Sequence, residues 1–175
     1  PDGTNFDPVF YALTYPDVEG TTVEELANDY WFYGIQAGRL PYLGAADVSA
    51  TSLIAYINQY RVSNGLSELT VNADLTAKAQ ARARELAEAQ YFAHSRPDTG
   101  ESWITIYGNW NNNYVRIGEN LAMGQSSAYN AFVAWTKSSG HNAIMLHSGV
   151  TDIGVGVAKS ISGKYYFVLH VGLPK

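Results

Sequence analysis

Two histidines and two glutamates are the residues of this sequence whose types and surroundings could support chemistry. His94 lies in the segment FAHSRPD and His141 in SSGHNA, each just after a predicted helix end. Glu101 and Glu119 fall in the loop-rich stretch between the two histidines. Two imidazoles and two carboxylates form a suitable ligand set for a divalent transition metal, and they are equally suited to acid–base catalysis.

The spacing of these four residues does not establish that they meet in one site. Solvated surface positions, or local hydrogen bonds at helix ends, would give the same pattern. No HExxH pair lies on one helical face, so the signature of the zinc proteases is absent. The serines near the histidines lie in no G-x-S-x-G turn, which argues against a serine hydrolase. If the site is catalytic, Glu101 and Glu119 are the candidate catalytic residues. If it binds a metal, they lie near the metal.

The larger, C-terminal part of the chain carries the elements that must position these side chains. Apolar residues at helical spacing predict helices over 52–63, from 72 to about 90, and over 127–137. Residues 91–125 are predicted to be mostly loop. Within 151–171, two runs of β-branched and aromatic residues flank a Ser-Gly-Lys turn and predict a β-hairpin. Helices first and antiparallel strands last make α+β the predicted fold class.

The N-terminal part has the pattern of a small helical unit rich in aromatic residues. An Asp-Pro start at Asp7 and a Tyr-Pro stop at Tyr15 bound its first predicted helix. The capping box TVEE, followed by apolar residues at helical spacing up to Tyr33, predicts a second helix. A stretch with proline and glycine follows. We expect a small aromatic helical module over 1–45 and a separate domain over 50–175.

Composition excludes several classes of protein. Of the 175 residues, 46% are apolar and 15% are charged, which favours a folded protein over a disordered one. The absence of cysteine excludes a disulfide framework, a thiolate metal site and a cysteine nucleophile. The net charge of −5 argues against general nucleic-acid binding. This charge is uneven, because residues 1–49 carry eight acidic side chains and one basic one, whereas residues 50–175 carry eight acidic and ten basic ones.

Four motifs follow one another in the C-terminal part of the chain: FAHSRPD, GENLA, SGHNAIM and GVGVA, before a tyrosine-rich last strand. Together they resemble the CAP superfamily, also called SCP/TAPS, which includes cysteine-rich secretory proteins, antigen 5 and plant pathogenesis-related proteins. The resemblance covers about residues 52–172 and is to the cysteine-free bacterial branch. It implies a three-layer α-β-α sandwich with a central antiparallel sheet, preceded here by the small helical unit.

The same resemblance implies a central cleft lined by two histidines and two glutamates. His94, Glu119 and His141 each occupy a matching motif, and Glu101 lies in a loop whose length varies among family members. Family members bind zinc or another divalent ion through the two histidines, with the carboxylates nearby. We therefore expect a divalent metal, zinc first, and no other cofactor. The last strand reads YFVLHV where the family has YWVQxF, and His170 is not a family ligand.

The N-terminal unit resembles a short aromatic module that is appended, often in tandem, to secreted bacterial proteins. The matching segments are FDPVFY and YPDV, then Tyr30 and the stretch over 34–39. No firm function accompanies this second resemblance.

We expect a secreted bacterial binding module, located outside the cell or at its surface, rather than an enzyme in the strict sense. Its cleft would take a divalent metal and an unidentified ligand of cell-wall, peptide or lipid chemistry. One alternative is a metal-assisted hydrolase of peptide, ester or cell-wall substrates, and another is an adhesion or lipid-binding module. The remaining expectations are a monomer, no nucleic-acid partner, no membrane span and a signal peptide already removed.

Overall fold

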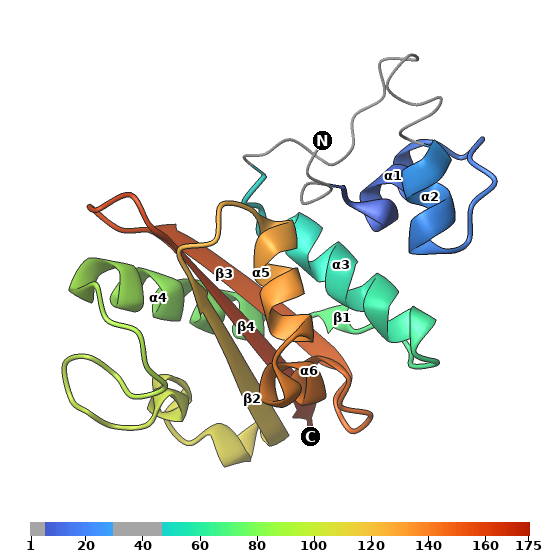
Figure 1. Ribbon diagram of the computed structural model, residues 1–175. Helices are drawn as coiled ribbons and strands as arrows, with labels where there is room; N and C mark the ends of the chain where they lie inside the picture. Colours follow the sequence, from blue (N-terminus) through green and yellow to red (C-terminus); the bar gives the residue numbers. More distant parts are fainter. Residues whose placement is uncertain (1–5, 30–46) are drawn as a thin grey trace. The chain divides into compact units, whose positions relative to one another are not determined.

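The computed structural model describes residues 6–29 and 47–175 of the chain (Figure 1). The chain divides into two compact units, Pro1–Asp47 and Val48–Lys175. The division falls between the segments that the sequence assigns to a helical module and to a larger domain. The features expected in the module from Tyr30 onward lie outside the described residues.

The described part of the N-terminal unit contains the two helices that its sequence predicts. They are α1 (Pro8–Thr14) and α2 (Val23–Asp29). The capping box is confirmed, because the backbone N–H of Thr22 donates to Glu25 Oε2 at 2.9 Å and the N–H of Glu25 donates to Thr22 Oγ1 at 3.2 Å. Backbone hydrogen bonds from Thr21 and Thr22 lower the pKa of Glu25 to about 2.

Three longer helices of the C-terminal unit begin close to their predicted positions. They are α3 (Ala50–Ser63), α4 (Ala73–Ala89) and α5 (Ala128–Thr136). The predicted cap residues act as expected: Asn72 Oδ1 accepts from two N–H groups of the first turn of α4, and Ser127 Oγ accepts from one of α5.

A four-stranded sheet in the order β1-β3-β4-β2 forms the middle of the C-terminal unit. Its strands are β1 (Thr70–Val71), β2 (Tyr114–Met123), β3 (Asp152–Lys159) and β4 (Tyr165–Pro174). Strands β3 and β4 form the predicted hairpin, and β4 also pairs antiparallel with β2. Strand β1 pairs in parallel with β3, so the sheet is mixed rather than wholly antiparallel.

The edge strand β2 lies inside the stretch 91–125, and the prediction of a mostly irregular segment is wrong there. The GEN centre of this strand breaks the alternation of apolar and polar residues that marks a half-buried strand. Glu119 and Asn120 are nevertheless buried, because each has hydrogen-bond partners on neighbouring elements. The rest of the stretch contains two 3₁₀ turns, Trp103–Tyr107 and Trp110–Asn112.

Helices cover both faces of the sheet, which confirms the predicted three-layer α-β-α sandwich (Figure 1). Helix α4 packs on β3 and β4 from one side, while α3, α5 and a short helix α6 (Ser139–Met145) lie on the other. Glycines in β3 allow α4 to approach closely, because a Cβ on Gly154 or Gly156 would overlap the helix backbone at Thr76 or Ala79.

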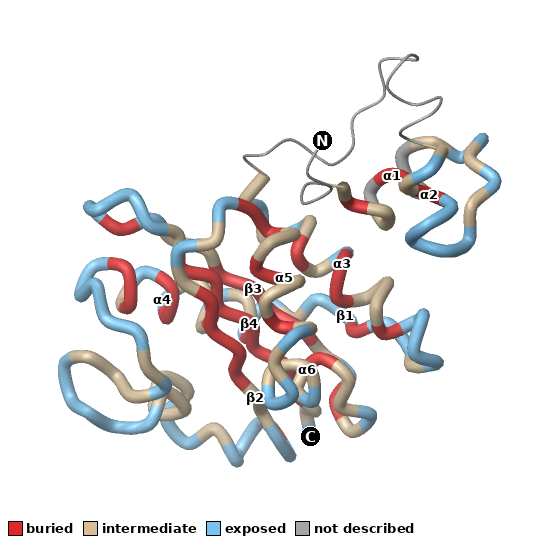
Figure 2. Tube along the Cα trace, viewed as in Figure 1, coloured by how far each residue is buried: buried red, intermediate tan, exposed pale blue. Residues whose placement is uncertain are grey.

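Apolar side chains fill both spaces between the sheet and its helices, and the buried positions follow the strands through the centre of the unit (Figure 2). The cluster facing α4 consists of Ala79, Ala83, Leu86, Ala87, Leu121, Tyr166 and Val168. On the opposite side, the almost fully buried Trp135 of α5 donates from Nε1 to the backbone oxygen of Leu121 at 2.9 Å. This bond attaches α5 to the edge strand β2.

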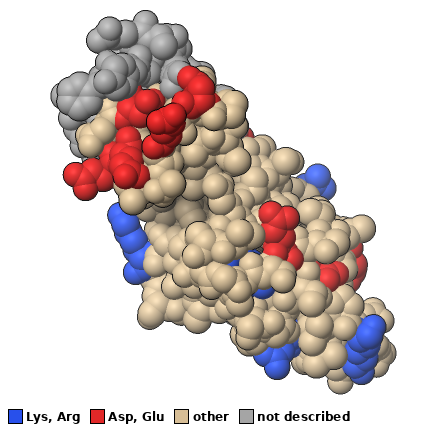
Figure 3. All heavy atoms as spheres, turned by 90° about the vertical axis from the view of Figure 1, so that its right-hand side faces the viewer, with Lys and Arg blue, Asp and Glu red and all other residues tan. Residues whose placement is uncertain are grey.

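The uneven charge of the sequence is visible on the surface. Asp and Glu side chains gather over the N-terminal unit in Figure 3, whereas the C-terminal unit shows charges of both signs scattered among uncharged residues. Within residues 6–29 and 47–175, the structure contains no helix with the length and apolar character needed to cross a membrane.

Candidate functional site

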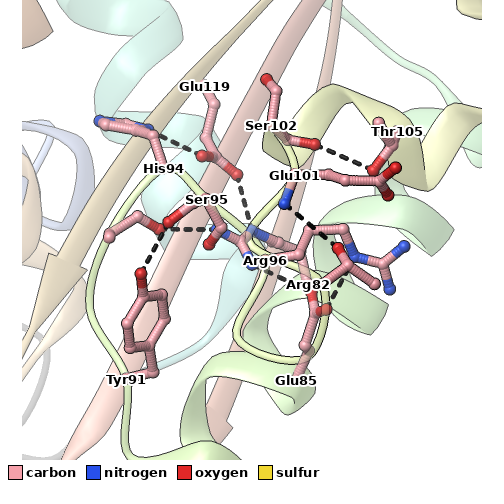
Figure 4. A network of polar contacts seen from close by, with 12 residues as sticks. Arg82, Glu85, Tyr91, His94, Ser95, Arg96, Glu101, Ser102, Thr105 and Glu119 are labelled. Carbon is pink, nitrogen blue, oxygen red and sulfur yellow. Dashed lines mark hydrogen bonds and ion pairs between the residues drawn. The ribbon is translucent and has the colours of Figure 1, made fainter.

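Glu119 is the centre of a buried polar network between α4 and β2 (Figure 4). This residue of β2 is only 3% exposed. Its Oε1 atom accepts a hydrogen bond from His94 Nδ1 at 2.8 Å. Its Oε2 atom faces Arg82 Nε at 3.3 Å and His170 Nε2 at 3.2 Å. Both carboxylate oxygens are therefore engaged by side-chain donors from three other segments of the chain.

Several contacts keep Glu119 ionised despite its burial. Burial acts to raise the pKa of its carboxyl group, but the hydrogen bonds from His170 and His94 and the positive charge of Arg82 outweigh this effect. The pKa of Glu119 consequently lies below its ordinary value. The network thus contains a fixed negative charge at neutral pH.

Arg82 connects this carboxylate to the backbone around His94. It occupies a fully buried position on α4, and its guanidinium also donates to Glu85 Oε2 at 3.0 Å. Its Nη2 atom donates to the backbone oxygens of Ala93 at 2.7 Å and Ser95 at 2.9 Å. Because these two residues flank His94, Arg82 fixes the chain on both sides of that histidine.

His170 continues the network into the core. Burial lowers its pKa, although the hydrogen bond to Glu119 and that carboxylate's charge act in the opposite direction. A neutral His170 that donates from Nε2 to Glu119 has its lone pair on Nδ1, which lies 2.7 Å from the hydroxyl of Tyr107. Burial raises the pKa of Tyr107, so its hydroxyl remains protonated and donates to His170.

His94 presents one ring nitrogen to the protein and the other to solvent. Its Nδ1 faces the ionised Glu119, so the proton lies on Nδ1 and the neutral ring carries a lone pair on Nε2. The side chain is 55% exposed. In Figure 4 the second ring nitrogen points away from Glu119. A carboxylate that orients a histidine in this way is the usual support of a metal-binding imidazole.

His141 follows the end of α5, as the sequence suggested, and lies within the short helix α6. Helix α6 is attached to β2 because the side-chain amide of Asn120 donates to the backbone oxygen of His141 at 2.9 Å. Burial lowers the pKa of His141, and the nearby His94 lowers it further. The two histidines are thus electrostatic neighbours, and His141 is disposed to be neutral.

Glu101 does not join the other three predicted site residues. It is exposed, and in Figure 4 its side chain extends away from His94 and Glu119. Its backbone oxygen accepts from the N–H of Arg96 at 2.7 Å, which closes the local turn. The structure therefore gathers His94, Glu119 and His141 into one region and leaves Glu101 on the outer side of its loop.

The site offers two imidazoles rather than a complete cage of protein ligands. In the described part of the chain, no group of three or more His, Cys, Asp and Glu side chains is placed to hold a metal ion. Glu119 acts through His94, since both of its oxygens already accept hydrogen bonds. Any ion at His94 and His141 would take its other ligands from water or from a bound molecule.

The sequence interpretation missed two central members of the network, Arg82 and His170. A signal for each was present. Arg82 falls three residues after Ala79 and four before Leu86 on the buried face of α4, where a charged residue needs a partner. His170 shares a strand face with Val168 in β4 and is fully buried.

Comparison with known proteins identifies the family. The profile of the family described as "CAP: Cysteine-rich secretory protein family" matches residues 54–171, and the chain belongs to this family. "Uncharacterized protein YkwD" of Bacillus subtilis (strain 168) is 31% identical over 108 residues, which are 62% of this chain and 42% of that relative. The chain therefore spans less than half the length of that relative.

Solved structures of the family share the fold. An outer surface protein from Borrelia burgdorferi superposes with a TM-score of 0.65 at 22% identity, covering 71% of this chain and 92% of its own. An extracellular protein containing a SCP domain from Bacillus anthracis str. Ames gives a TM-score of 0.63 at 21% identity, covering 70% and 39%. A third structure, NaASP2 with Zn²⁺, has a TM-score of 0.51 at 15% identity, covering 71% and 80%.

Proposed function

We propose that this chain is an extracellular binding module whose cleft holds a divalent cation between His94 and His141. The observation that carries the proposal is the 2.8 Å bond from His94 Nδ1 to the buried Glu119, which leaves Nε2 of His94 as a ligand directed to solvent. Imidazole nitrogens suit zinc among the common divalent metals. Two protein ligands leave several coordination positions for water and a bound molecule, so the cation binds weakly and exchangeably.

Family relatives support the setting of this proposal. One is named an outer surface protein and another an extracellular protein, and one structure carries Zn²⁺. We propose the same location outside the cell for this chain. The bound molecule would have cell-wall, peptide or lipid chemistry, and the metal would anchor one of its oxygen atoms.

A metal-assisted hydrolase is the second candidate, and the surroundings of Glu119 argue against it. A general base needs access to the substrate and a pKa near the working pH. Glu119 is only 3% exposed, accepts hydrogen bonds from three side chains and has a pKa below its ordinary value. Glu101 is exposed and turned away from His94. Binding without hydrolysis is therefore the function that this geometry favours.

Calorimetric titration with Zn²⁺ tests the proposal. We expect saturable binding by the wild type and at least about tenfold weaker binding by His94→Ala and His141→Ala, which remove the two imidazoles. The matched control is His147→Ala, a histidine outside the site, which should bind Zn²⁺ like the wild type. Equal binding by all four proteins would show that Zn²⁺ does not bind at His94 and His141.

A further inference from the structure

An apolar pocket of about 350 Å³ lies between the end of α6 and the sheet, beside β2. Its lining includes Arg116, Gly118, Ile144, His147, Val150 and Val171. None of the residues of the proposed metal site lines it. Pockets of this volume, apolar inside with a few polar groups that converge, are typical of small-ligand sites.

The walls of this pocket are aliphatic. Ile144 comes from α6, Val171 from β4 and Val150 from the segment before β3. A Cβ at Gly118 would lie 3.3 Å from the Cγ2 atoms of both Ile144 and Val171. A side chain at position 118 would therefore enter the gap between these two walls, and glycine leaves that gap open.

The rim of the pocket carries a guanidinium group that a histidine orients. Arg116 Nη1, which is always a donor, lies 2.6 Å from His147 Nε2, so this ring nitrogen is the acceptor of the bond. The other N–H groups of the Arg116 guanidinium have no partner among the described residues. A carboxylate at the rim would accept from them.

The positive charge of the rim has no ion-pair partner in the part of the chain that the structure describes. Within residues 6–29 and 47–175, the ion pairs of the structure include none that involves Arg116. The position of His147 is nevertheless well defined, because the buried Arg61 donates from Nη1 to the backbone oxygens of Met145 at 2.7 Å and His147 at 3.1 Å. The rim thus presents a guanidinium that His147 orients and that has no anionic partner among the described residues.

We propose that this pocket binds a carboxylate carried on a compact apolar group. The carboxylate oxygens would accept from the free N–H groups of Arg116, which His147 orients, and the apolar group would lie against Ile144, Val150 and Val171. A free acid and the C-terminal residue of a peptide present the same chemistry. The proposal rests on this pocket alone and does not depend on a metal at His94 and His141.

The test is a titration of the ¹⁵N-labelled chain with N-acetyl-L-leucine, followed by NMR at the amides of Gly118 and Gly149. We expect saturable shifts at both amides. N-acetyl-L-leucinamide, which has the same apolar group and no charge, should bind at least about tenfold more weakly. Two further ligands distinguish the sources of the carboxylate. Acetyl-Ala-Ala-Leu with a free C-terminus represents a peptide end, and 4-methylpentanoate represents a free acid. The ligand that binds more tightly identifies the source that the pocket prefers.

Arg116→Gln should weaken binding of N-acetyl-L-leucine by at least about tenfold, because it removes a charge-assisted donor. The matched control is Arg84→Gln, which removes an exposed arginine of α4 outside the pocket and should bind like the wild type. If the acid and the amide bind the wild type equally, or if neither binds saturably, the proposal is wrong whatever the variants do. Unchanged binding by a folded Arg116→Gln would overturn it as well.

Discussion

The Nε atom of Arg82 lies 3.3 Å from Oε2 of Glu119, and neither side chain is exposed to solvent. These residues belong to α4 and β2, so a buried ion pair joins one helical layer to the edge strand of the sheet. Glu119 also orients the ring of His94. The same pair therefore connects two layers of the sandwich and holds the candidate metal ligand in place.

Glu119→Gln should lower the free energy of unfolding by about 3–5 kcal/mol, because it leaves the charge of Arg82 buried without its full set of partners. Urea unfolding of the wild type and the variant measures this difference. The matched control is Glu88→Gln on the exposed side of α4, where a change within about 0.5 kcal/mol is expected. Similar losses in both variants would show that breaking the buried ion pair costs no more than changing an exposed glutamate.

Arg82→Lys should loosen the segment that carries His94. The arginine donates to two carboxylates and to the backbone oxygens of Ala93 and Ser95, and a single ammonium group cannot reach all four acceptors. We expect hydrogen exchange of the amides over 91–102 to become at least about tenfold faster, which mass spectrometry can measure. Arg84→Lys, two residues away and exposed, should leave exchange there unchanged. Unaltered exchange in Arg82→Lys would show that Arg82 does not hold the segment around His94 in place.

His170 should make stability fall as the solution is acidified. Burial lowers its pKa in the folded protein, whereas the unfolded chain takes up a proton near pH 6.5. Its contribution to stability is therefore fully present above about pH 6.5 and is lost as the pH falls towards the folded pKa. One proton taken up on unfolding gives a slope of at most about 1.4 kcal/mol per pH unit.

His170→Gln should reduce that slope between pH 6.5 and 5, measured by urea unfolding at each pH. This window lies above the range where Glu119 matters, because a carboxyl group with a lowered pKa loses its contribution only below about pH 4.3. His141, whose pKa is also lowered by burial, keeps its own share of the slope in the variant. An identical slope in His170→Gln and the wild type would show that His170 is not held neutral by the fold.

The helices of the C-terminal unit could be predicted because their signals are local. Asn72 and Ser127 form cap bonds with residues two or three positions away, and those bonds depend on nothing distant in the chain. Strand β2 could not be found in this way. Its centre contains Glu119 and Asn120, and their burial becomes favourable only when Arg82 on α4 and the backbone of α6 supply partners.

Part of the candidate site could be predicted because its signals are also local. His94, Glu119 and His141 lie in recognisable motifs, so their types and order pointed to one region. The partners of Glu119 were not visible, because the register of β2 against β4 is what places His170 opposite Glu119. Glu101 shows the opposite case: its position near a motif suggested a ligand, and the turn closed by its backbone directs the side chain outward.

Gly156→Ala should lower the free energy of unfolding by at least about 2–3 kcal/mol. An added Cβ at this position of β3 would overlap the backbone of α4 at Ala79, and a backbone cannot move aside as the end of a flexible side chain can. The helix and the strand would have to separate along their whole contact.

Gly140→Ala is the matched control for this substitution. An added Cβ there meets nothing within 4 Å, and the residue lies in helix α6, so stability should be unchanged or higher by up to about 1 kcal/mol. Urea unfolding of both variants beside the wild type decides the question. If Gly156→Ala unfolds at the same urea concentration as Gly140→Ala, then α4 does not approach β3 closely enough to require glycine, and the support that this helix gives to Arg82 must come from elsewhere in the layer.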